Sequence, residues 1–364
     1  MNYLDLRIEK VRKSVLKAAD AVLITDDITR RYVFNFDSSA GYGIISKKRC
    51  ELYLDFRYYE IACIAQKKGE ISKDIVIKEA IEARGSVLKG FIEQEKISTL
   101  LYENTRMTCS QFGVLESSVF GMCELMGCET LFDDLRTVKD DYELQRMIEA
   151  QRITDMSFGH IVSFIKKGMT EREIALELEF FMKKNGSEGM SFDIICVSGT
   201  KSSLPHGKPD ETVVKEGFLT LDFGAKFDGY CSDMTRTVCI GKPDSEMLQI
   251  YDTVLCAQNA AFEKIKGGVV GSDVDKAARD LIDRAGFEGC FGHSLGHGLG
   301  LEIHESAVFA KNYTKPIPQG AVLSVEPGIY IEGKCGVRIE DVVFLTENGC
   351  KNLTNSTKDI IIIQ

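Results

Sequence analysis

Residues 219–237 contain the dipeptide Asp228-Gly229 between two strand-like stretches. An Asp-Gly pair in that position is typical of a two-residue hairpin turn. In the resulting register Phe227 pairs with Tyr230. This pairing also fixes the partners of all the remaining residues in the two strands. This hairpin constrains the fold more than any other stretch, because a shift of one residue would turn each of its side chains to the opposite face.

The predicted register brings two aspartates together. Gly224 faces Asp233, and because Asp222 lies two residues before Gly224, both aspartates share one face of the hairpin. Thr235 stands opposite Asp222. The aspartates become diagonal neighbours with backbones about 7–8 Å apart, and Gly224 leaves space between them. Converging carboxylates repel each other unless a cation lies between them. The hairpin therefore indicates a metal site, or else a pair of solvated aspartates.

The length and charge of the chain limit what it can be. With 364 residues it exceeds one ordinary core, so we expect two domains. The net charge of -10 argues against a nucleic-acid surface. No apolar run approaches the ~20 residues needed to cross a membrane, and residues 1–18 lack the apolar region and cleavage site of a signal peptide. We expect a cytoplasmic protein without nucleic-acid or membrane partners.

The 12 cysteines do not form a recognisable framework. They are scattered from Cys50 to Cys350 without a C-x-x-C pair, so we interpret most as small buried apolar residues. Cys123 and Cys128 are the closest pair, and no histidine lies near them. This argues against a zinc knuckle.

Strands alternate with helices in the first 130 residues, which predicts an α/β domain. We expect this N-terminal domain over 1–130, a linker over 131–140 and a second domain over 141–364. The helices expected in the first domain span 5–18, 57–68, 79–95 and 109–127, and the expected strands span 21–25, 43–46, 51–55, 74–77 and 98–102.

The second domain is expected to begin with two helices, over 141–164 and 170–184. A weak internal echo follows, because the helix over 170–184 and a later helical segment each lie between two glycines. This pattern suits a domain built from two similar halves. Residues that match at an offset of 100 are Gly168 and Gly268, Ile174 and Val274, and Gly186 and Gly286.

Four of the five histidines lie between residues 206 and 304. His293 and His297 belong to the glycine-rich segment 292–300, and His304 follows it. Because glycine adds no side-chain bulk, such a loop brings backbone and imidazole close to a ligand. The cluster of histidines therefore favours a functional site here. The remaining histidine, His160, lies in a helical stretch and is best interpreted as structural or exposed.

Two further carboxylates occur on apolar strands. Glu326 ends the segment 321–327, and Glu340 lies in 336–345, where Arg338 shares its face and offers an ordinary salt bridge. With the two hairpin aspartates and one histidine, these make four carboxylates and one imidazole. Such a set suits Mn²⁺, Co²⁺ or Fe²⁺ better than a structural zinc. Four negative charges would balance two divalent cations and leave a bridging hydroxide as the reactive group.

The chain resembles the proline-specific metallopeptidases, namely Xaa-Pro aminopeptidase and Xaa-Pro dipeptidase (prolidase), of the methionine aminopeptidase and creatinase group with the "pita-bread" fold. The resemblance covers nearly the whole chain. It rests on motifs that occur in the family's order: Leu204-Pro205-His206-Gly207, the hairpin from Asp222 to Thr237, Gly296-His297-Gly298-Leu299-Gly300, Ile303-His304-Glu305, Val325-Glu326-Pro327-Gly328 and Val337-Arg338-Ile339-Glu340-Asp341.

The resemblance implies an α/β creatinase-type domain followed by a pita-bread catalytic domain, and a homodimer. It implies two divalent metal ions, most often Mn²⁺ with Co²⁺, Fe²⁺ or Zn²⁺ as alternatives, with Asp233 and Glu340 shared by both ions. The implied ligands are Asp222, Asp233, His297, Glu326 and Glu340. Glu326 would also move the proton, and the other implied catalytic residues are His206, His293, His304 and Arg338. One departure is visible, since Ala307 stands where the family usually has proline.

Several functions remain open at this point. An Xaa-Pro aminopeptidase accepts longer peptides with proline at the second position, whereas a prolidase is restricted to dipeptides, and the motifs do not separate the two. A plain methionine aminopeptidase leaves the first 130 residues unexplained. A metal-free binding module or a metal-free hydrolase of the creatinase type would be expected to have lost ligands, and all five ligand positions are filled here.

Overall fold

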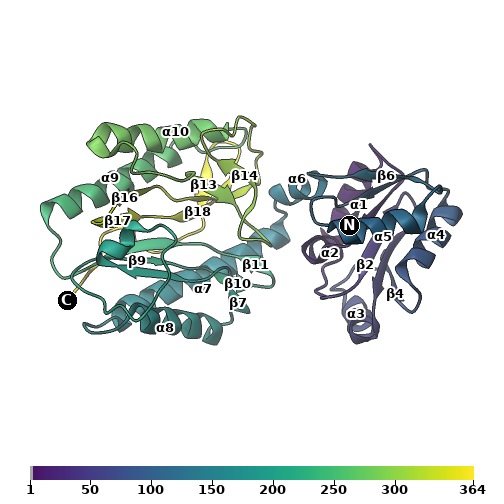
Figure 1. Cartoon of the computed structure of the whole chain (residues 1–364), viewed down its shortest axis with the longest axis horizontal. Coiled ribbons are helices and arrows are strands. Elements are labelled where there is room, and N and C mark those ends of the chain that lie inside the picture. Colours follow the sequence, from purple (N-terminus) through teal and green to yellow (C-terminus); the bar gives the residue numbers. More distant parts are fainter. Residues whose placement is uncertain (1–2) are drawn as a thin grey trace. The chain divides into compact units, whose positions relative to one another are not determined.

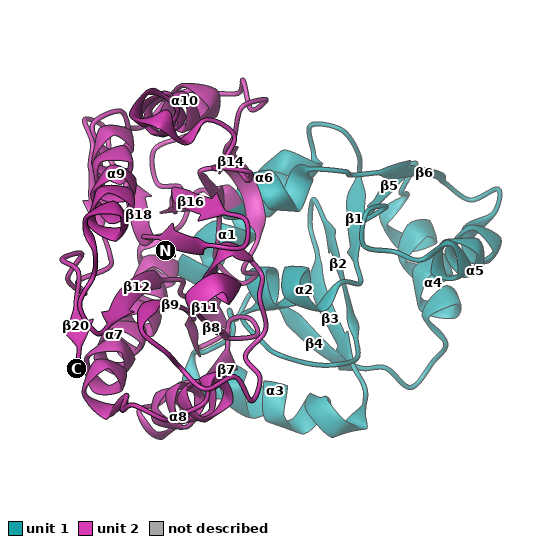
Figure 2. Ribbon diagram, turned by 60° about the vertical axis from the view of Figure 1, so that its left-hand side comes forward, with its two compact units in different colours: residues 1–136 teal, residues 137–364 magenta. Residues whose placement is uncertain are grey.

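The computed structural model describes residues 3–364, so the first two residues of the expected N-terminal domain lie outside the described part. The chain forms two compact units, residues 1–136 and 137–364 (Figure 2). In residues 3–364 no helix has the length and apolar character needed to span a bilayer.

The first unit is built on one mixed six-stranded sheet in the order β4-β3-β2-β1-β5-β6. β1 pairs antiparallel with β2 and parallel with β5, and β3 pairs parallel with β4. The strands are β1 (Ala21–Ile24), β2 (Tyr42–Ser46), β3 (Cys50–Leu54), β4 (Val76–Glu79), β5 (Thr99–Tyr102) and β6 (Glu124–Gly127). The helices are α1 (Tyr3–Val15), α2 (Asp27–Phe34), α3 (Phe56–Lys68), α4 (Arg84–Glu95), α5 (Cys109–Val119) and α6 (Leu131–Thr137).

Several expectations for this unit differ from the structure. The helix expected over 79–95 begins at Arg84, because residues up to Glu79 pair with β3 as strand β4. The helix expected over 109–127 ends at Val119, because Gly121 adopts a positive φ of 72° and residues 124–127 pair in parallel with β5. Helix α2 was not expected, although Asp26 caps it by accepting a hydrogen bond from the Thr29 amide. The segment 131–140 contains α6, and the division between the units falls after residue 136.

The second unit consists of two similar halves. The first half contains α7 (Asp141–Phe164), α8 (Glu171–Lys184), β7 (Gly189–Met190), β8 (Ile195–Ser198), the short helix η1 (Gly199–Ser203), β9 (Gly217–Asp222), β10 (Ala225–Phe227), β11 (Tyr230–Cys231) and β12 (Thr235–Ile240). The second contains α9 (Ser245–Phe262), α10 (Gly271–Ile282), η2 (Asp283–Phe287), β13 (Gly296–Gly298), β14 (Glu305–Phe309), β15 (Val322–Val325), β16 (Gly328–Ile331), β17 (Cys335–Arg338), β18 (Asp341–Leu345), β19 (Cys350–Asn352) and β20 (Ile362–Ile363).

In each half two helices cover a sheet, and in Figure 1 the sheets lie between α7 and α8 on one side and α9 and α10 on the other. The sheet orders are β20-β12-β9-β8 and β14-β13-β15-β18-β19. The glycines matched at an offset of 100 adopt the same backbone conformation, with φ values of 94° and 84° for Gly168 and Gly268 and of 101° and 92° for Gly186 and Gly286. Each half also has its own apolar core.

The hairpin register expected from the sequence is confirmed. Phe227 pairs with Tyr230, and Asp222 pairs with Thr235. Both turn residues, Asp228 and Gly229, have positive φ values of 46° and 79°, as a type I′ turn requires.

Candidate metal centre and the cavity around it

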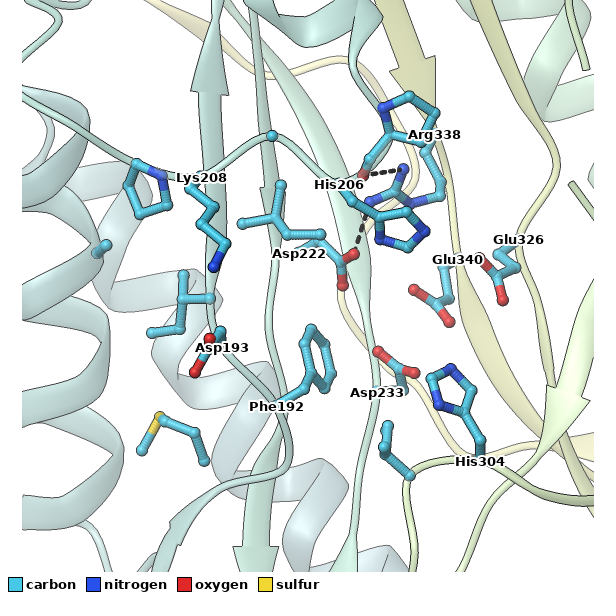
Figure 3. Close-up of a pocket in the computed structure, with 18 of the residues that line it drawn as sticks. Phe192, Asp193, His206, Lys208, Asp222, Asp233, His304, Glu326, Arg338 and Glu340 are labelled. Carbon is cyan, nitrogen blue, oxygen red and sulfur yellow. Dashed lines mark hydrogen bonds and ion pairs between the residues drawn. The ribbon is translucent and has the colours of Figure 1, made fainter. Parts of the chain in front are cut away.

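Five acidic and imidazole side chains converge from strand ends of both halves of the second unit. Asp222 ends β9, and Asp233 lies between β11 and β12. His297 is the central residue of β13, Glu326 follows β15 directly, and Glu340 lies between β17 and β18. All five line one cavity of about 1050 Å³, part of which is drawn in Figure 3. The structure thus brings together every ligand position expected from the sequence.

The tightest part of the cluster consists of Asp233, His297 and Glu340. One ligand atom from each lies within 4.8 Å of the others. The Nε2 atom of His297 is 3.6 Å from Asp233 Oδ2 and 3.4 Å from Glu326 Oε1. Side chains that meet at these distances around a common point can share a bound cation.

Several carboxylate oxygens of the cluster have no partner within the described chain. Asp222 Oδ1, Asp233 Oδ1 and Glu340 Oε1 are buried and accept no hydrogen bond. The other oxygens of two of these groups are held, because Arg338 Nη2 donates to Asp222 Oδ2 at 2.5 Å and Thr235 Oγ1 donates to Glu340 Oε2 at 2.7 Å. A buried, unsatisfied carboxylate oxygen is costly. The residues present therefore fit hard divalent cations, which take oxygen ligands.

The electrostatics of the cluster lead to the same conclusion. Burial, followed by the charges of neighbouring carboxylates, raises the pKa values of Asp233 and Glu340 well above their usual range. Burial also raises the pKa of Glu326 to about 7. Without a cation the site favours protonated carboxyl groups, and a bound divalent ion would reverse that preference.

Glu326 is expected to contribute stability to the metal-free protein that is lost as the pH rises from about 5 to about 8. The folded-state pKa of Glu326 is about 7 against an ordinary value of 4.5. Within that window Glu326 in the folded state holds a proton that the unfolded state has released, so its contribution to the free energy of unfolding falls with rising pH, by on the order of 1–3 kcal/mol. Urea unfolding of the chelated protein at both pH values measures this.

The matched control for that measurement is Glu326→Gln, which has no titrating group at this position and should show a shallower decline. The metal-loaded wild-type protein should lose the decline, because bound cations favour the ionised carboxylates. If the metal-free wild-type and Glu326→Gln proteins show the same change in stability over this pH range, this account of Glu326 is wrong, because the histidines with lowered pKa values are common to both proteins.

Local hydrogen bonds orient His297 and Glu326. His297 Nδ1 lies 3.1 Å from the Gly298 carbonyl oxygen and donates to it as the Nδ1–H tautomer, so Nε2 faces the carboxylates as a lone pair. Ser324 Oγ accepts from the His297 amide and donates to Glu326 Oε1, both at 3.0 Å. Burial lowers the pKa of His297, which keeps the imidazole neutral and suited to metal ligation.

Arg338 is buried and fixed from three sides. Its guanidinium donates to Asp222, to the Tyr330 hydroxyl at 2.7 Å and to the Pro205 carbonyl at 3.3 Å. The two contacts of this group drawn in Figure 3 are those with Asp222 and with the 205–206 segment. Arg338 therefore holds one ligand carboxylate and the segment that carries His206.

His293 lines the cavity as well, and local contacts fix its ring. Its Nδ1 lies 2.8 Å from the Ser294 carbonyl oxygen and its Nε2 lies 2.9 Å from the Tyr330 hydroxyl. Burial, assisted by Arg338, lowers the pKa of His293 to about 4, so the ring is neutral. Both ring nitrogens are occupied by protein groups. Tyr330 was not singled out from the sequence, and its only signal there is its place four residues after Glu326.

The other two histidines face the cavity more freely. His206 is exposed at its wall. His304 packs edge-on against His297, with ring centroids 4.4 Å apart, and burial lowers its pKa. His160 lies outside this cluster, where it contacts Glu177 and stacks on Phe181.

Ala307 occupies a bulge beside the centre. Gly298 pairs with Glu305 and His297 pairs with Val308, so β14 has two extra residues between these pairs. Ala307 lies within the bulge with a positive φ of 70°. Gly298 makes the close approach possible, because a Cβ there would lie 2.3 Å from the Ser306 carbonyl oxygen.

A buried ion pair supports the same strand. Lys139 Nζ lies 3.0 Å from Glu305 Oε2, and both side chains are almost fully buried. The Lys139 amide also donates to the Gly320 carbonyl oxygen at 2.9 Å. Lys139 falls in the segment 131–140 that the sequence suggests as a linker. Nothing local in the sequence marks it, because its partner lies 166 residues away.

Comparison with known proteins identifies the family to which the chain belongs. Residues 145–347 match metallopeptidase family M24, and residues 7–138 match the creatinase/prolidase N-terminal domain. The uncharacterized peptidase YqhT of Bacillus subtilis is 39% identical over 363 residues, which cover 98% of this chain and 100% of that protein.

Solved structures of similar proteins extend over the whole chain. The Xaa-Pro dipeptidase from Bacillus anthracis superposes with a TM-score of 0.93 at 39% identity, covering 99% of both chains. The X-Pro aminopeptidase from Thermotoga maritima superposes with a TM-score of 0.90 at 38% identity, covering 98% of this chain and 100% of the other.

Proposed function

Because the chain belongs to metallopeptidase family M24 and carries a creatinase/prolidase N-terminal domain, we propose that it hydrolyses the X-Pro bond at the N-terminus of peptides. The observation that carries this proposal is the group of buried, unpartnered carboxylate oxygens inside a cavity large enough for a peptide. Xaa-Pro aminopeptidase is the activity that we propose first. Xaa-Pro dipeptidase is the second, because similar structures carry both names.

The proposed cofactor is a pair of divalent ions, Mn²⁺ first, with Co²⁺, Fe²⁺ or Zn²⁺ as alternatives. Asp222, Asp233, His297, Glu326 and Glu340 would hold them. Bound there, the ions would activate a water molecule near neutral pH and polarise the scissile carbonyl. A cytoplasmic homodimer is proposed on the resemblance alone.

The chain's own residues would then position the substrate and move the proton. Glu326, whose carboxylate is oriented by the Ser324 hydroxyl, would take a proton from water and deliver it to the leaving proline nitrogen. His304 and His206 would contact the peptide from the cavity wall. Arg338 holds Asp222, and His293, which contacts the Tyr330 hydroxyl, would hold the peptide or stabilise the tetrahedral intermediate.

The proposal explains why a dedicated enzyme is needed. The X-Pro bond is a tertiary amide without an N–H group. A peptidase that recognises the scissile amide through a hydrogen bond from its N–H cannot use that contact here. In this site the recognition would fall instead on metals, imidazoles and the carbonyl side of the bond.

The test is hydrolysis of Ala-Pro, Ala-Pro-Ala and Ala-Ala by chelated protein reloaded with Mn²⁺. We expect cleavage of both proline peptides and none of Ala-Ala, with activity lost on chelation and regained on reloading. Cleavage of Ala-Pro alone would assign a dipeptidase. If Mn²⁺, Co²⁺ and Zn²⁺ all fail to support cleavage, the enzyme reading is wrong and a metal-free binding module on the same fold takes its place.

A further inference from the structure

One cation of the cavity has no role in the centre described above. Lys208 lines the cavity together with Phe192 and Asp193, and its side chain is among those drawn in Figure 3. Its segment follows His206 and has no regular secondary structure. The side chain is therefore available to a molecule that enters the cavity.

The other two strong cations of the cavity are already engaged. Arg338 binds Asp222 and Tyr330, and Arg172 pairs with Glu211 at 2.8 Å. Within residues 3–364, Lys208 takes part in no ion pair or hydrogen bond. Asp193 points into the same cavity, and no ion pair joins its carboxylate to Lys208. The ammonium group of Lys208 is thus the strong cation that the cavity leaves uncommitted.

The backbone that carries Lys208 is held on both sides. On one side the Gly207 amide donates to the Leu204 carbonyl at 3.0 Å, and a Cβ on Gly207 would lie only 2.8 Å from Val197 Cγ1. On the other side Asp210 pairs with Lys201 at 2.8 Å. Pro209 restricts φ between them. A fixed backbone with an unengaged side chain is suited to binding, because little order is lost elsewhere when a ligand arrives.

The charge balance of the cavity indicates what this ammonium would bind. Seven carboxylates line the cavity, so a substrate carboxylate entering it meets like charges on most sides. Bound metal ions would neutralise the carboxylates of the metal centre. Lys208 is placed to neutralise a substrate carboxylate that lies next to the centre. A hydrogen bond between ammonium and carboxylate is among the stronger polar contacts in proteins.

We propose that Lys208 is a specificity-determining residue that binds a carboxylate of the substrate. The inference rests on the proposed peptidase function and adds to it a preference for peptides with an anionic group close to the scissile bond. That group is either the C-terminal carboxylate of a dipeptide or the side-chain carboxylate of an acidic first residue. The same ammonium–carboxylate chemistry serves both, and matched substrates distinguish them.

The experiment compares kcat/KM for two substrate pairs with the Mn²⁺-reloaded enzyme. Ala-Pro against Ala-Pro-NH2 reports the C-terminal carboxylate, and Glu-Pro-NH2 against Gln-Pro-NH2 reports the side-chain carboxylate. In Lys208→Met we expect one of the two anionic-to-neutral ratios to fall by about tenfold or more. The loss should lie mainly in KM, and Lys208→Arg should retain most of the ratio.

The matched control is Lys215→Met, which removes an exposed lysine outside the cavity and should leave both ratios unchanged. Ratios in Lys208→Met within about twofold of wild type for both pairs would overturn the inference while leaving the peptidase proposal intact. A wild-type enzyme that cleaves none of the four peptides would contradict the peptidase proposal. Calorimetric binding of the same peptides to the Mn²⁺-loaded protein would then decide whether Lys208 binds carboxylate.

Discussion

Replacing Asp233 with asparagine is expected to lower kcat/KM on Ala-Pro by about 10³-fold or more and, at the same time, to stabilise the metal-free protein. Loss of activity follows from Asp233 lying in the tightest ligand cluster, together with His297 and Glu340. A metal site supplies several kcal/mol of transition-state stabilisation, and each 1.36 kcal/mol corresponds to about a tenfold change in rate.

The gain in stability has a separate cause. Asp233 Oδ1 is buried without a partner, and burial with neighbouring carboxylates raises the pKa of the group well above its usual range. Asparagine keeps the shape and removes the charge, so the free energy of unfolding of the metal-free protein should rise by on the order of 1–3 kcal/mol. A metal ligand should therefore show a loss of activity together with a gain in metal-free stability, whereas replacing a residue that only supports the fold should lower both.

Metal content, peptide hydrolysis and urea unfolding with and without Mn²⁺ are the measurements. Asp252→Asn on the exposed face of α9 is the matched control and should change none of them by much. An Asp233→Asn variant that keeps its metal and retains activity within tenfold of wild type would show that the cluster is not the catalytic centre.

Replacing Ala307 with proline is expected to lower the free energy of unfolding by about 3 kcal/mol or more. Ala307 has a φ of 70°, whereas the proline ring holds φ near -65°. Proline therefore cannot enter this bulge unless β14 rebuilds, and β14 is the strand beside His304 and His297. Activity should fall together with stability.

Ala307→Gly is the control variant, because it should change the free energy of unfolding in the opposite direction. Glycine adopts positive φ without the Cβ clash, so we expect a gain of up to about 1 kcal/mol. Urea unfolding of the three proteins and their kcat/KM on Ala-Pro measure both effects. An Ala307→Pro variant as stable as wild type would mean that the bulge adapts freely and that the departure at this position has no structural consequence.

The sequence predicted the hairpin and its register because both depend on local rules. Asp228-Gly229 specifies the turn, and the two-residue period then assigns Asp222 and Asp233 to one face. The reason given for Gly224 was incomplete. A Cβ there would lie 1.9 Å from the Ser232 carbonyl oxygen, so the glycine admits the opposite backbone in addition to leaving room near the aspartates.

The features that the sequence did not predict depend on distant partners. Residues 124–127 continue an apparent helix, and their pairing with β5 makes them a strand instead. Tyr330 gains its role from His293 and Arg338, and Lys139 gains its role from Glu305. Single-sequence patterns describe a residue's own neighbourhood, so contacts of this kind become visible only in the folded chain.

The division of the ligands between the two halves has a consequence for how the unit responds to its metals. Asp222 and Asp233 come from the first half, and His297, Glu326 and Glu340 come from the second. Bound ions would therefore act as cross-links across the internal duplication, and neither repeat alone carries a complete centre. Chelation would remove these cross-links and leave the two repeats joined by protein contacts alone, such as Arg338 with Asp222 and Thr235 with Glu340.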